Sequence, residues 1–100
     1  MLKSLEELIN IIRSRKNSDV SKSYTARLLN NKVLSNEKVE EEFQELLEAI
    51  KTGKNQTHEA ADLMYHLLVL LETNNIKIED VMEELQNRRK QSGLEEKESR

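Results

Sequence analysis

The chain contains no cysteine and no proline, and only 2 of its 100 residues are glycine. The lack of cysteine excludes disulfide bonds, thiolate metal sites and cysteine nucleophiles. Glycine and proline are the residues that interrupt helices. Their scarcity, together with abundant charged residues, favours long helices with solvated outer faces. No apolar run approaches the roughly 20 residues needed to cross a bilayer, so we expect no membrane partner.

The chain also lacks an excess of basic charge, because 19 acidic residues outnumber 16 basic ones and the formal net charge is −3. Proteins that bind nucleic acid usually carry a basic face, so nucleic acid is not an expected partner. The N-terminus shows no signal-peptide pattern, and the expected compartment is therefore the cytoplasm. A chain of this length is expected to form one domain with a modest core.

The spacing of apolar residues predicts an all-α fold with four main helices and one short helix. Ser4 and Glu7 match a capping box for the first helix, which should fade near Lys16. Ser23 is a suitable N-cap for a short helix that runs to about Leu29. The remaining boundaries are expected at Ser35 or Asn36 and Gly53 for the third helix, at Asn55 or Thr57 and Asn74 for the fourth, and at Ile78 and about Arg89 for the last.

We expect residues 1–90 to form the all-α domain and residues 91–100 to form a polar C-terminal tail. The tail carries a break at Gly93, and polar termini of this kind are commonly mobile.

The segment from Ala60 to Leu71 is apolar on nearly every side of a helix. A helix without a polar side must be buried all round, and three neighbouring helices do not easily enclose it. We therefore expect a helical bundle completed by a symmetric homodimer or a larger homo-oligomer. The exceptions in this segment are Asp62, His66 and the hydroxyl of Tyr65. A buried carboxylate such as Asp62 needs a compensating partner.

Acidic residues recur at helical spacing on two segments of the chain. Glu41, Glu42 and Glu45 share one side of the third helix, and Glu59 and Asp62 share one side of the fourth. If the two helices pack antiparallel, the carboxylates meet and repel, and a divalent cation would turn that repulsion into binding. Oxygen ligands without cysteine suit Mg²⁺ or Mn²⁺ better than Zn²⁺.

Plainer interpretations of these residues remain open. A glutamate-rich side of a helix is often only solvated, and Lys38 can pair locally with Glu41 or Glu42. His66 on an apolar helix is more often a hydrogen-bonded core residue than a ligand.

The pattern Glu41-Glu42-x-x-Glu45 followed by Glu59-x-x-Asp62 resembles the acidic signature of the MazG-type all-α nucleotide pyrophosphohydrolases, in which these carboxylates bind Mg²⁺. Ser23-Tyr24-Thr25 and the run from Glu59 to Leu71 extend the resemblance to the phosphoribosyl-ATP pyrophosphohydrolase family. The resemblance covers nearly the whole chain. The chain departs from the family at Glu40, at Asn30 or Asn31, and in a loop that lacks proline. These positions affect loop geometry and not the acidic motif.

The resemblance implies hydrolysis of 1-(5-phosphoribosyl)-ATP to 1-(5-phosphoribosyl)-AMP and pyrophosphate, the second step of histidine biosynthesis. It implies that Glu42, Glu45, Glu59 and Asp62 hold Mg²⁺. Glu41, by its position, is the candidate that orients or deprotonates the attacking water. The candidates for contacts with the phosphates or ribose of the substrate are Arg15, Lys16, Ser23, Tyr24, Thr25, Lys38, His66 and Arg88.

Two other functions stay open at the level of sequence. One is a related enzyme that clears ordinary or non-standard nucleoside triphosphates. The other is a helical association module without catalysis, whose apolar helix serves only partner binding.

Overall fold

The computed structural model describes residues 2–89, which form helices and no strand, as the sequence predicts. The helices are α1 (Leu2–Ser14), α2 (Tyr24–Leu29), α3 (Lys32–Thr52), α4 (Gln56–Thr73) and α5 (Ile78–Arg88). The predicted tail at residues 91–100 lies outside this range. None of the described helices is both long and apolar enough to span a membrane.

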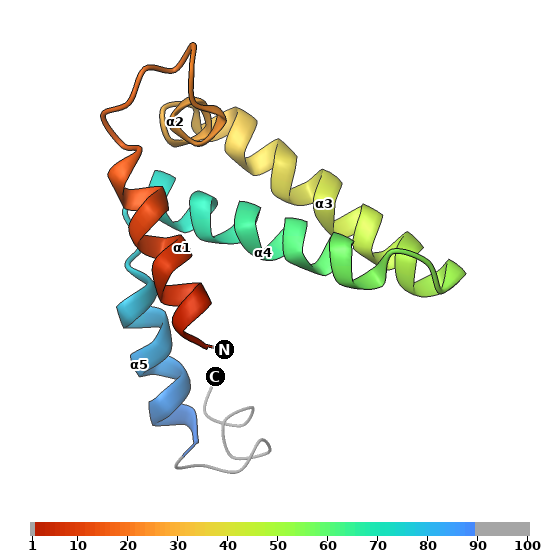
Figure 1. The fold of residues 1–100 in the computed structure, drawn as a ribbon. Helices are drawn as coiled ribbons and strands as arrows, with labels where there is room; N and C mark the ends of the chain where they lie inside the picture. Colours follow the sequence, from red (N-terminus) through yellow and green to blue (C-terminus); the bar gives the residue numbers. More distant parts are fainter. Residues whose placement is uncertain (1, 90–100) are drawn as a thin grey trace.

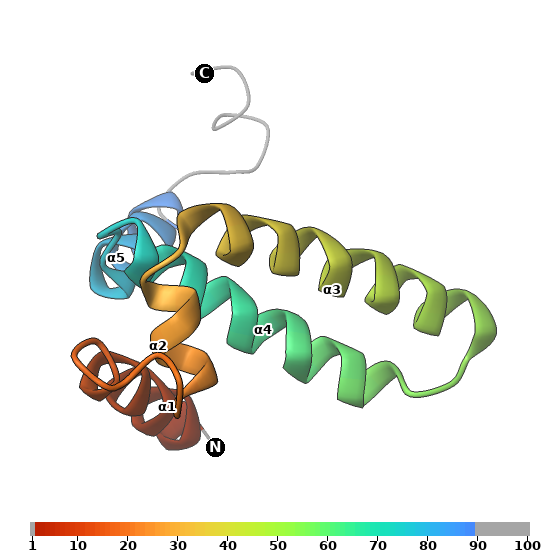
Figure 2. The ribbon, with the colours of Figure 1, turned by 90° about the horizontal axis from the view of Figure 1, so that it is seen from above.

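The two longest helices, α3 and α4, form an antiparallel hairpin that projects from the rest of the molecule (Figure 1). Figure 2 shows them side by side along most of their length, and they share the most extensive helix–helix contact. The other helices gather at one end of the hairpin, beside the C-terminal half of α4. The fold therefore has a packed end and a two-helix arm.

Two predicted helix ends are confirmed by the local hydrogen bonds and backbone angles. The Ser23 hydroxyl accepts a hydrogen bond from the amide of Ala26 at 3.1 Å, which caps α2. Gly53 ends α3 with a φ of 74°, a left-handed conformation that glycine adopts without steric cost.

Two predicted helix starts are wrong. The first helix already includes Leu2, so Ser4 lies inside it and is not a cap. α3 begins at Lys32, because the Asn31 side chain accepts a hydrogen bond from the amide of Leu34 at 3.0 Å and caps the helix there. Ser35 is consequently an interior helix residue, and it is buried.

The core lies at the packed end, where α1 and α2 meet α4. Its fully buried side chains include Ile12, Leu28 and Val69, and Leu68 joins them. The arm therefore contributes to the core mainly through the C-terminal half of α4.

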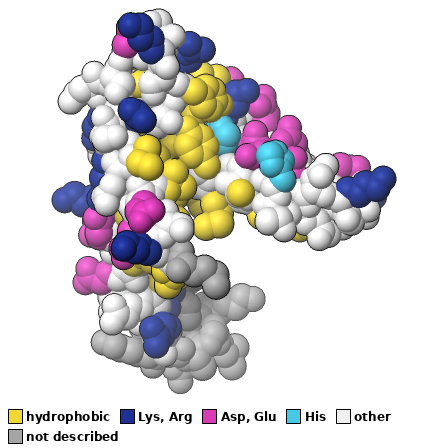
Figure 3. Space-filling model, viewed as in Figure 1, with side chains coloured by type: hydrophobic (Ala, Val, Ile, Leu, Met, Phe, Trp, Pro, Cys, Tyr) yellow, Lys and Arg dark blue, Asp and Glu magenta, His cyan; other side chains and the backbone are white. Residues whose placement is uncertain are grey.

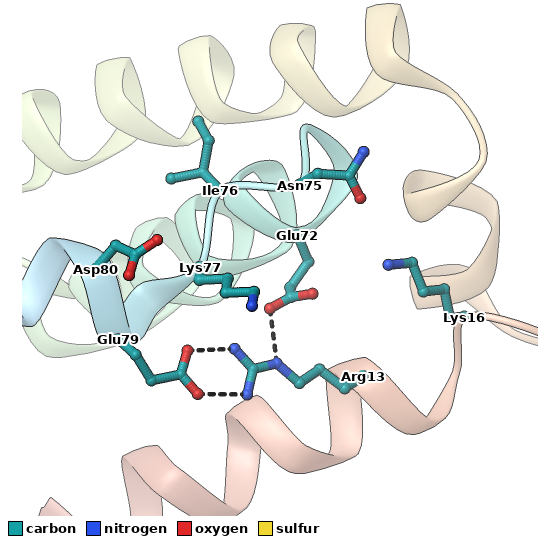
Figure 4. A pocket seen from close by; sticks show the side chains of 8 residues that line it. All are labelled: Arg13, Lys16, Glu72, Asn75, Ile76, Lys77, Glu79 and Asp80. Carbon is teal, nitrogen blue, oxygen red and sulfur yellow. Dashed lines mark hydrogen bonds and ion pairs between the residues drawn. The ribbon is translucent and has the colours of Figure 1, made fainter.

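One guanidinium links three helices at this end. Arg13 of α1 donates from Nε to Glu72 of α4 at 2.8 Å, and its two terminal nitrogens donate to Glu79 of α5 at 2.8 and 2.6 Å (Figure 4). We call these three residues the Arg13 cluster. Bidentate arginine–carboxylate pairs fix geometry as well as charge, so this cluster holds α5 against α1 and α4.

The apolar helix α4 is not enclosed within a single chain. Met64 is 51% exposed and Leu67 is 44% exposed. On α3, the side chains of Phe43, Leu47 and Ile50 are exposed as well, at a spacing that places them on one side of the helix. Both helices of the arm thus present uncovered apolar surface.

Candidate metal centre

Carboxylates from both helices of the arm meet between α3 and α4. One ligand oxygen from each of Glu42, Glu45 and Glu59 lies within 4.8 Å of the others. Glu59 also belongs to a second set, in which it lies within the same distance of Asp62 and His58. We call Glu42, Glu45, Glu59 and Asp62 the acidic cluster. Figure 3 shows acidic and histidine side chains gathered on this part of the surface.

Two oxygens of the acidic cluster are buried without compensation. Glu42 Oε2 and Glu59 Oε2 have no hydrogen-bond partner among residues 2–89. Burial raises the pKa of Glu42 and of Glu59, and the neighbouring carboxylate of Glu45 raises both further. Buried, unpaired acceptor oxygens that repel one another are the donor set that a hard divalent cation requires. The residues present therefore fit such a cation.

Glu41 lies beside the acidic cluster but belongs to neither set of ligand atoms. Its carboxylate pairs with Lys38 Nζ at 3.1 Å, the local pairing that the sequence left open. It also lines a shallow hollow on α3 with Glu37, Glu40 and Glu45, the last of which belongs to the acidic cluster. Its predicted role with the attacking water stays a prediction.

A chain of hydrogen bonds connects α2 to the backbone of α4 at Asp62, a residue of the acidic cluster. His66 is buried, and its Nδ1 lies 2.8 Å from the carbonyl oxygen of Asp62. Because a carbonyl only accepts, Nδ1 carries the proton, and Nε2 of a neutral ring then accepts from the Tyr24 hydroxyl at 3.1 Å. The Thr25 hydroxyl is hydrogen-bonded to that of Tyr65. Burial raises the pKa of the Tyr24 phenol, and the positive charge of Lys38 partly opposes this shift.

Three of the predicted substrate contacts lie away from the acidic cluster in a single chain. Lys16 lines a pocket with Glu72 (Figure 4), and at 1.5 Å per residue Glu72 is roughly 20 Å along α4 from Glu59. Arg15 follows the end of α1 and is exposed. Arg88 lies near the end of α5, where its Nε donates to Glu84 at 3.1 Å.

Sequence reasoning missed His58, which the structure places next to Asp62. His58 Nε2 lies 3.2 Å from Asp62 Oδ2. The spacing of four residues between them was the available signal, because side chains at i and i+4 meet on one side of a helix.

Comparison with known proteins shows similarity along nearly the whole chain. A family model described as phosphoribosyl-ATP pyrophosphohydrolase matches residues 5–89. The phosphoribosyl-ATP pyrophosphatase of Rhizobium johnstonii is 43% identical over 97% of this chain and 94% of its own length. Proteins of the same name from Nitrosospira multiformis and Caulobacter vibrioides are 44% and 40% identical, covering 96% of this chain and 82% and 92% of their own lengths. No solved structure matches the chain significantly.

Proposed function

The chain belongs to the phosphoribosyl-ATP pyrophosphohydrolase family, and we propose that it hydrolyses 1-(5-phosphoribosyl)-ATP to 1-(5-phosphoribosyl)-AMP and pyrophosphate, the second step of histidine biosynthesis. The observation that carries this proposal is the full-length similarity to relatives named for this activity. The reaction breaks the phosphoanhydride between the α and β phosphates. Water adds across this bond, so that one product takes up its hydroxyl group and the other its proton. The two products are phosphoribosyl-AMP and pyrophosphate.

We further propose that the metal is Mg²⁺, with Mn²⁺ as an alternative, and that Glu42, Glu45, Glu59 and Asp62 hold it. The two buried oxygens without partners support this assignment. A bound Mg²⁺ would supply charge neutralisation for the triphosphate and for the departing pyrophosphate. Without that charge, the acidic cluster would repel the substrate.

Glu41 is our candidate for orienting or deprotonating the attacking water. It lies one residue before Glu42 and carries the exposed carboxylate nearest in sequence to the acidic cluster. Glu41 is paired with Lys38, so Lys38 would have to move for both Glu41 oxygens to face the water. Lys38 would then be available to contact a substrate phosphate. A substrate phosphate that drew Lys38 away would leave Glu41 Oε2 free to accept a proton.

The hydroxyl-bearing residues of α2 and its cap are candidates for the nucleoside part of the substrate. A neutral His66 that accepts from Tyr24 leaves the lone pairs of the Tyr24 oxygen for a donor such as a ribose hydroxyl. Thr25 is linked to Tyr65 in the same region, and Ser23 is committed to capping α2. His66 thus acts by holding Tyr24 in place.

We propose that two copies of the chain form a symmetric dimer through the uncovered apolar sides of α3 and α4. Phe43, Leu47 and Met64 would be buried in such an interface. This dimer would explain why three predicted substrate contacts lie away from the acidic cluster of their own chain. Arg15, Lys16 and Arg88 would instead complete the site of the partner subunit. Light scattering on the purified chain tests the dimer, and Leu47→Glu should shift it toward monomer.

A substrate panel tests the activity directly. Pyrophosphate release from phosphoribosyl-ATP, ATP and non-standard nucleoside triphosphates is measured with and without Mg²⁺, and kcat/KM is compared. The proposal requires the highest kcat/KM for phosphoribosyl-ATP. A higher value for ordinary triphosphates would identify a nucleotide-clearing enzyme, and no turnover with no Mg²⁺ binding would identify an association module.

A further inference from the structure

Within the proposed function, we propose that His58 is an additional ligand when the acidic cluster holds a first-row transition-metal dication such as Co²⁺ in place of Mg²⁺. Its imidazole gives the site a nitrogen donor, which raises the affinity for first-row transition-metal dications and adds little to the affinity for Mg²⁺. The sequence pattern assigns only oxygen ligands to this site, so the inference comes from the position of the His58 side chain.

The geometry places His58 in reach of the same ion as its neighbours. Its ring nitrogen, an oxygen of Glu59 and an oxygen of Asp62 all lie within 4.8 Å of one another. Glu59 links this set to Glu42 and Glu45, so the two sets adjoin. His58 is exposed, with a side-chain exposure of 72%, and it can turn toward an ion without disturbing the core.

The chemistry of the two sets differs. Glu42, Glu45 and Glu59 offer only carboxylate oxygens, which suit Mg²⁺. His58, Glu59 and Asp62 offer one nitrogen and two carboxylates, and imidazole increases affinity for Co²⁺ or Zn²⁺ much more than for Mg²⁺. The competing interpretation is an ion pair between a protonated His58 and Asp62, which needs no metal and would oppose cation binding. Metal titrations separate the two interpretations.

The first experiment measures metal affinity alone, with no nucleotide present. Mg²⁺ and Co²⁺ are titrated calorimetrically into the full chain and into His58→Gln. Loss of a metal ligand should weaken Co²⁺ binding by at least about tenfold, the lower end of what losing even an outer-shell partner costs. Mg²⁺ binding should change by less than about twofold, because the carboxylates that Mg²⁺ prefers remain.

The matched control is His58→Glu, which keeps a ligand at this position but exchanges nitrogen for oxygen. It should bind Mg²⁺ at least as tightly as the unmodified chain and lose the added affinity for Co²⁺. Equal Co²⁺ affinity in all three proteins would overturn the assignment of His58.

A spectroscopic readout identifies the nitrogen directly. The Mn²⁺-loaded chain should show coupling to ¹⁴N in pulsed electron paramagnetic resonance, and the coupling should vanish in His58→Gln. The other histidine of the chain is His66, so His66→Gln should retain the signal. Metal binding without ¹⁴N coupling would overturn the role of His58 alone. Failure of the unmodified chain to bind any divalent cation would overturn the proposed metal site with it.

Discussion

The Arg13 cluster and the acidic cluster both concentrate carboxylates, and they differ in how the negative charge is balanced. In the first, a guanidinium donates to Glu72 and to both oxygens of Glu79, which lowers the pKa of Glu79 to about 2. In the second, burial and like charges raise the pKa of Glu42 and Glu59. Glu42, Glu45 and Glu59 have no Lys or Arg ion pair among the described residues.

The difference separates structural charge from charge that requires a ligand. The Arg13 cluster is complete within the chain, and it stabilises the packed end. The acidic cluster leaves buried oxygens without partners, so its neutralisation must come from outside the chain. A carboxylate cluster is therefore informative about function only when its counter-charge is missing.

Removing the charge of one carboxylate in the acidic cluster should give the largest effect on activity. Asp62→Asn keeps the size of the side chain but removes its charge, and we expect Mg²⁺-dependent pyrophosphate release to fall by roughly 100-fold or more. Circular dichroism should show unchanged helix content. Asp80→Asn makes the same change on the exposed surface of α5 and should leave activity intact. Full activity in Asp62→Asn would remove Asp62 from the metal site.

Breaking the Arg13 cluster should lower the stability of the chain and leave the acidic cluster unaffected, the reverse of what we expect for Asp62→Asn. Arg13→Gln leaves the carboxylate of Glu72, only 14% exposed, without its cation, and we expect a loss of about 1–2 kcal/mol in the free energy of unfolding. For a domain of this size Tm falls by about 4–8 °C per kcal/mol. Thermal unfolding measures this loss, and Glu83→Gln on α5 is the control. Mg²⁺-dependent pyrophosphate release measured well below Tm should be unchanged, and a loss as large as that in Asp62→Asn would contradict the separation of the two clusters.

The contributions of the two clusters to the stability of the chain should also change with pH in opposite directions. Groups with raised pKa values, such as Glu42 and Glu59, contribute stability below their ordinary value of 4.5, and that contribution is lost as pH rises through the raised values. Glu79 has a lowered pKa, so its contribution is present above 4.5 and is lost as pH falls toward about 2.

The measurement is Tm with Mg²⁺ and with EDTA between about pH 5 and about pH 8. We expect the gain in Tm from Mg²⁺ to widen as pH rises, because the acidic cluster loses protons while Glu79 is already ionised. Glu42→Gln should narrow this gain. A gain that is constant with pH would show that Mg²⁺ stabilises the chain elsewhere.

The smallest effect should come from the exposed pair between Lys38 and Glu41. Lys38→Gln should leave the free energy of unfolding nearly unchanged, because ion pairs at this spacing on a helix surface are weak and screened by solvent. Mg²⁺ affinity should not fall, since a positive charge beside the acidic cluster is removed. Urea unfolding and calorimetry measure the two quantities. Weaker Mg²⁺ binding would show that Lys38 supports the site and does not merely pair beside it.

Local sequence patterns predict much of the fold because most helix ends here depend on neighbouring residues. Ser23 and Gly53 act within a few residues of their own positions, and both predictions hold. The start of α3 was missed because Asn31, Ser35 and Asn36 are all suitable caps. Tertiary packing decides among them, since Ser35 is buried near Thr73 of α4, with the two hydroxyl oxygens 3.5 Å apart.

The candidate site follows from the same kind of pattern only in part. Helical spacing and an antiparallel turn are enough to bring Glu42 and Glu45 to Glu59. The spacing allows Lys38 to pair with Glu41 or with Glu42, and only the structure shows that Glu41 is the partner. The contacts of Arg13 join residues 59 and 66 positions apart, and no local pattern contains them.

The acidic cluster has a consequence for the order of folding, because all its carboxylates lie between positions 42 and 62 on one helical hairpin. Closing so short a loop costs little chain entropy, and contacts of low sequence separation form quickly. If the cluster binds Mg²⁺ as proposed, the ion can bind before the two ends of the chain dock, and fraying of α1 or α5 need not release it. Hydrogen exchange with Mg²⁺ present should accordingly show protection concentrated in the hairpin.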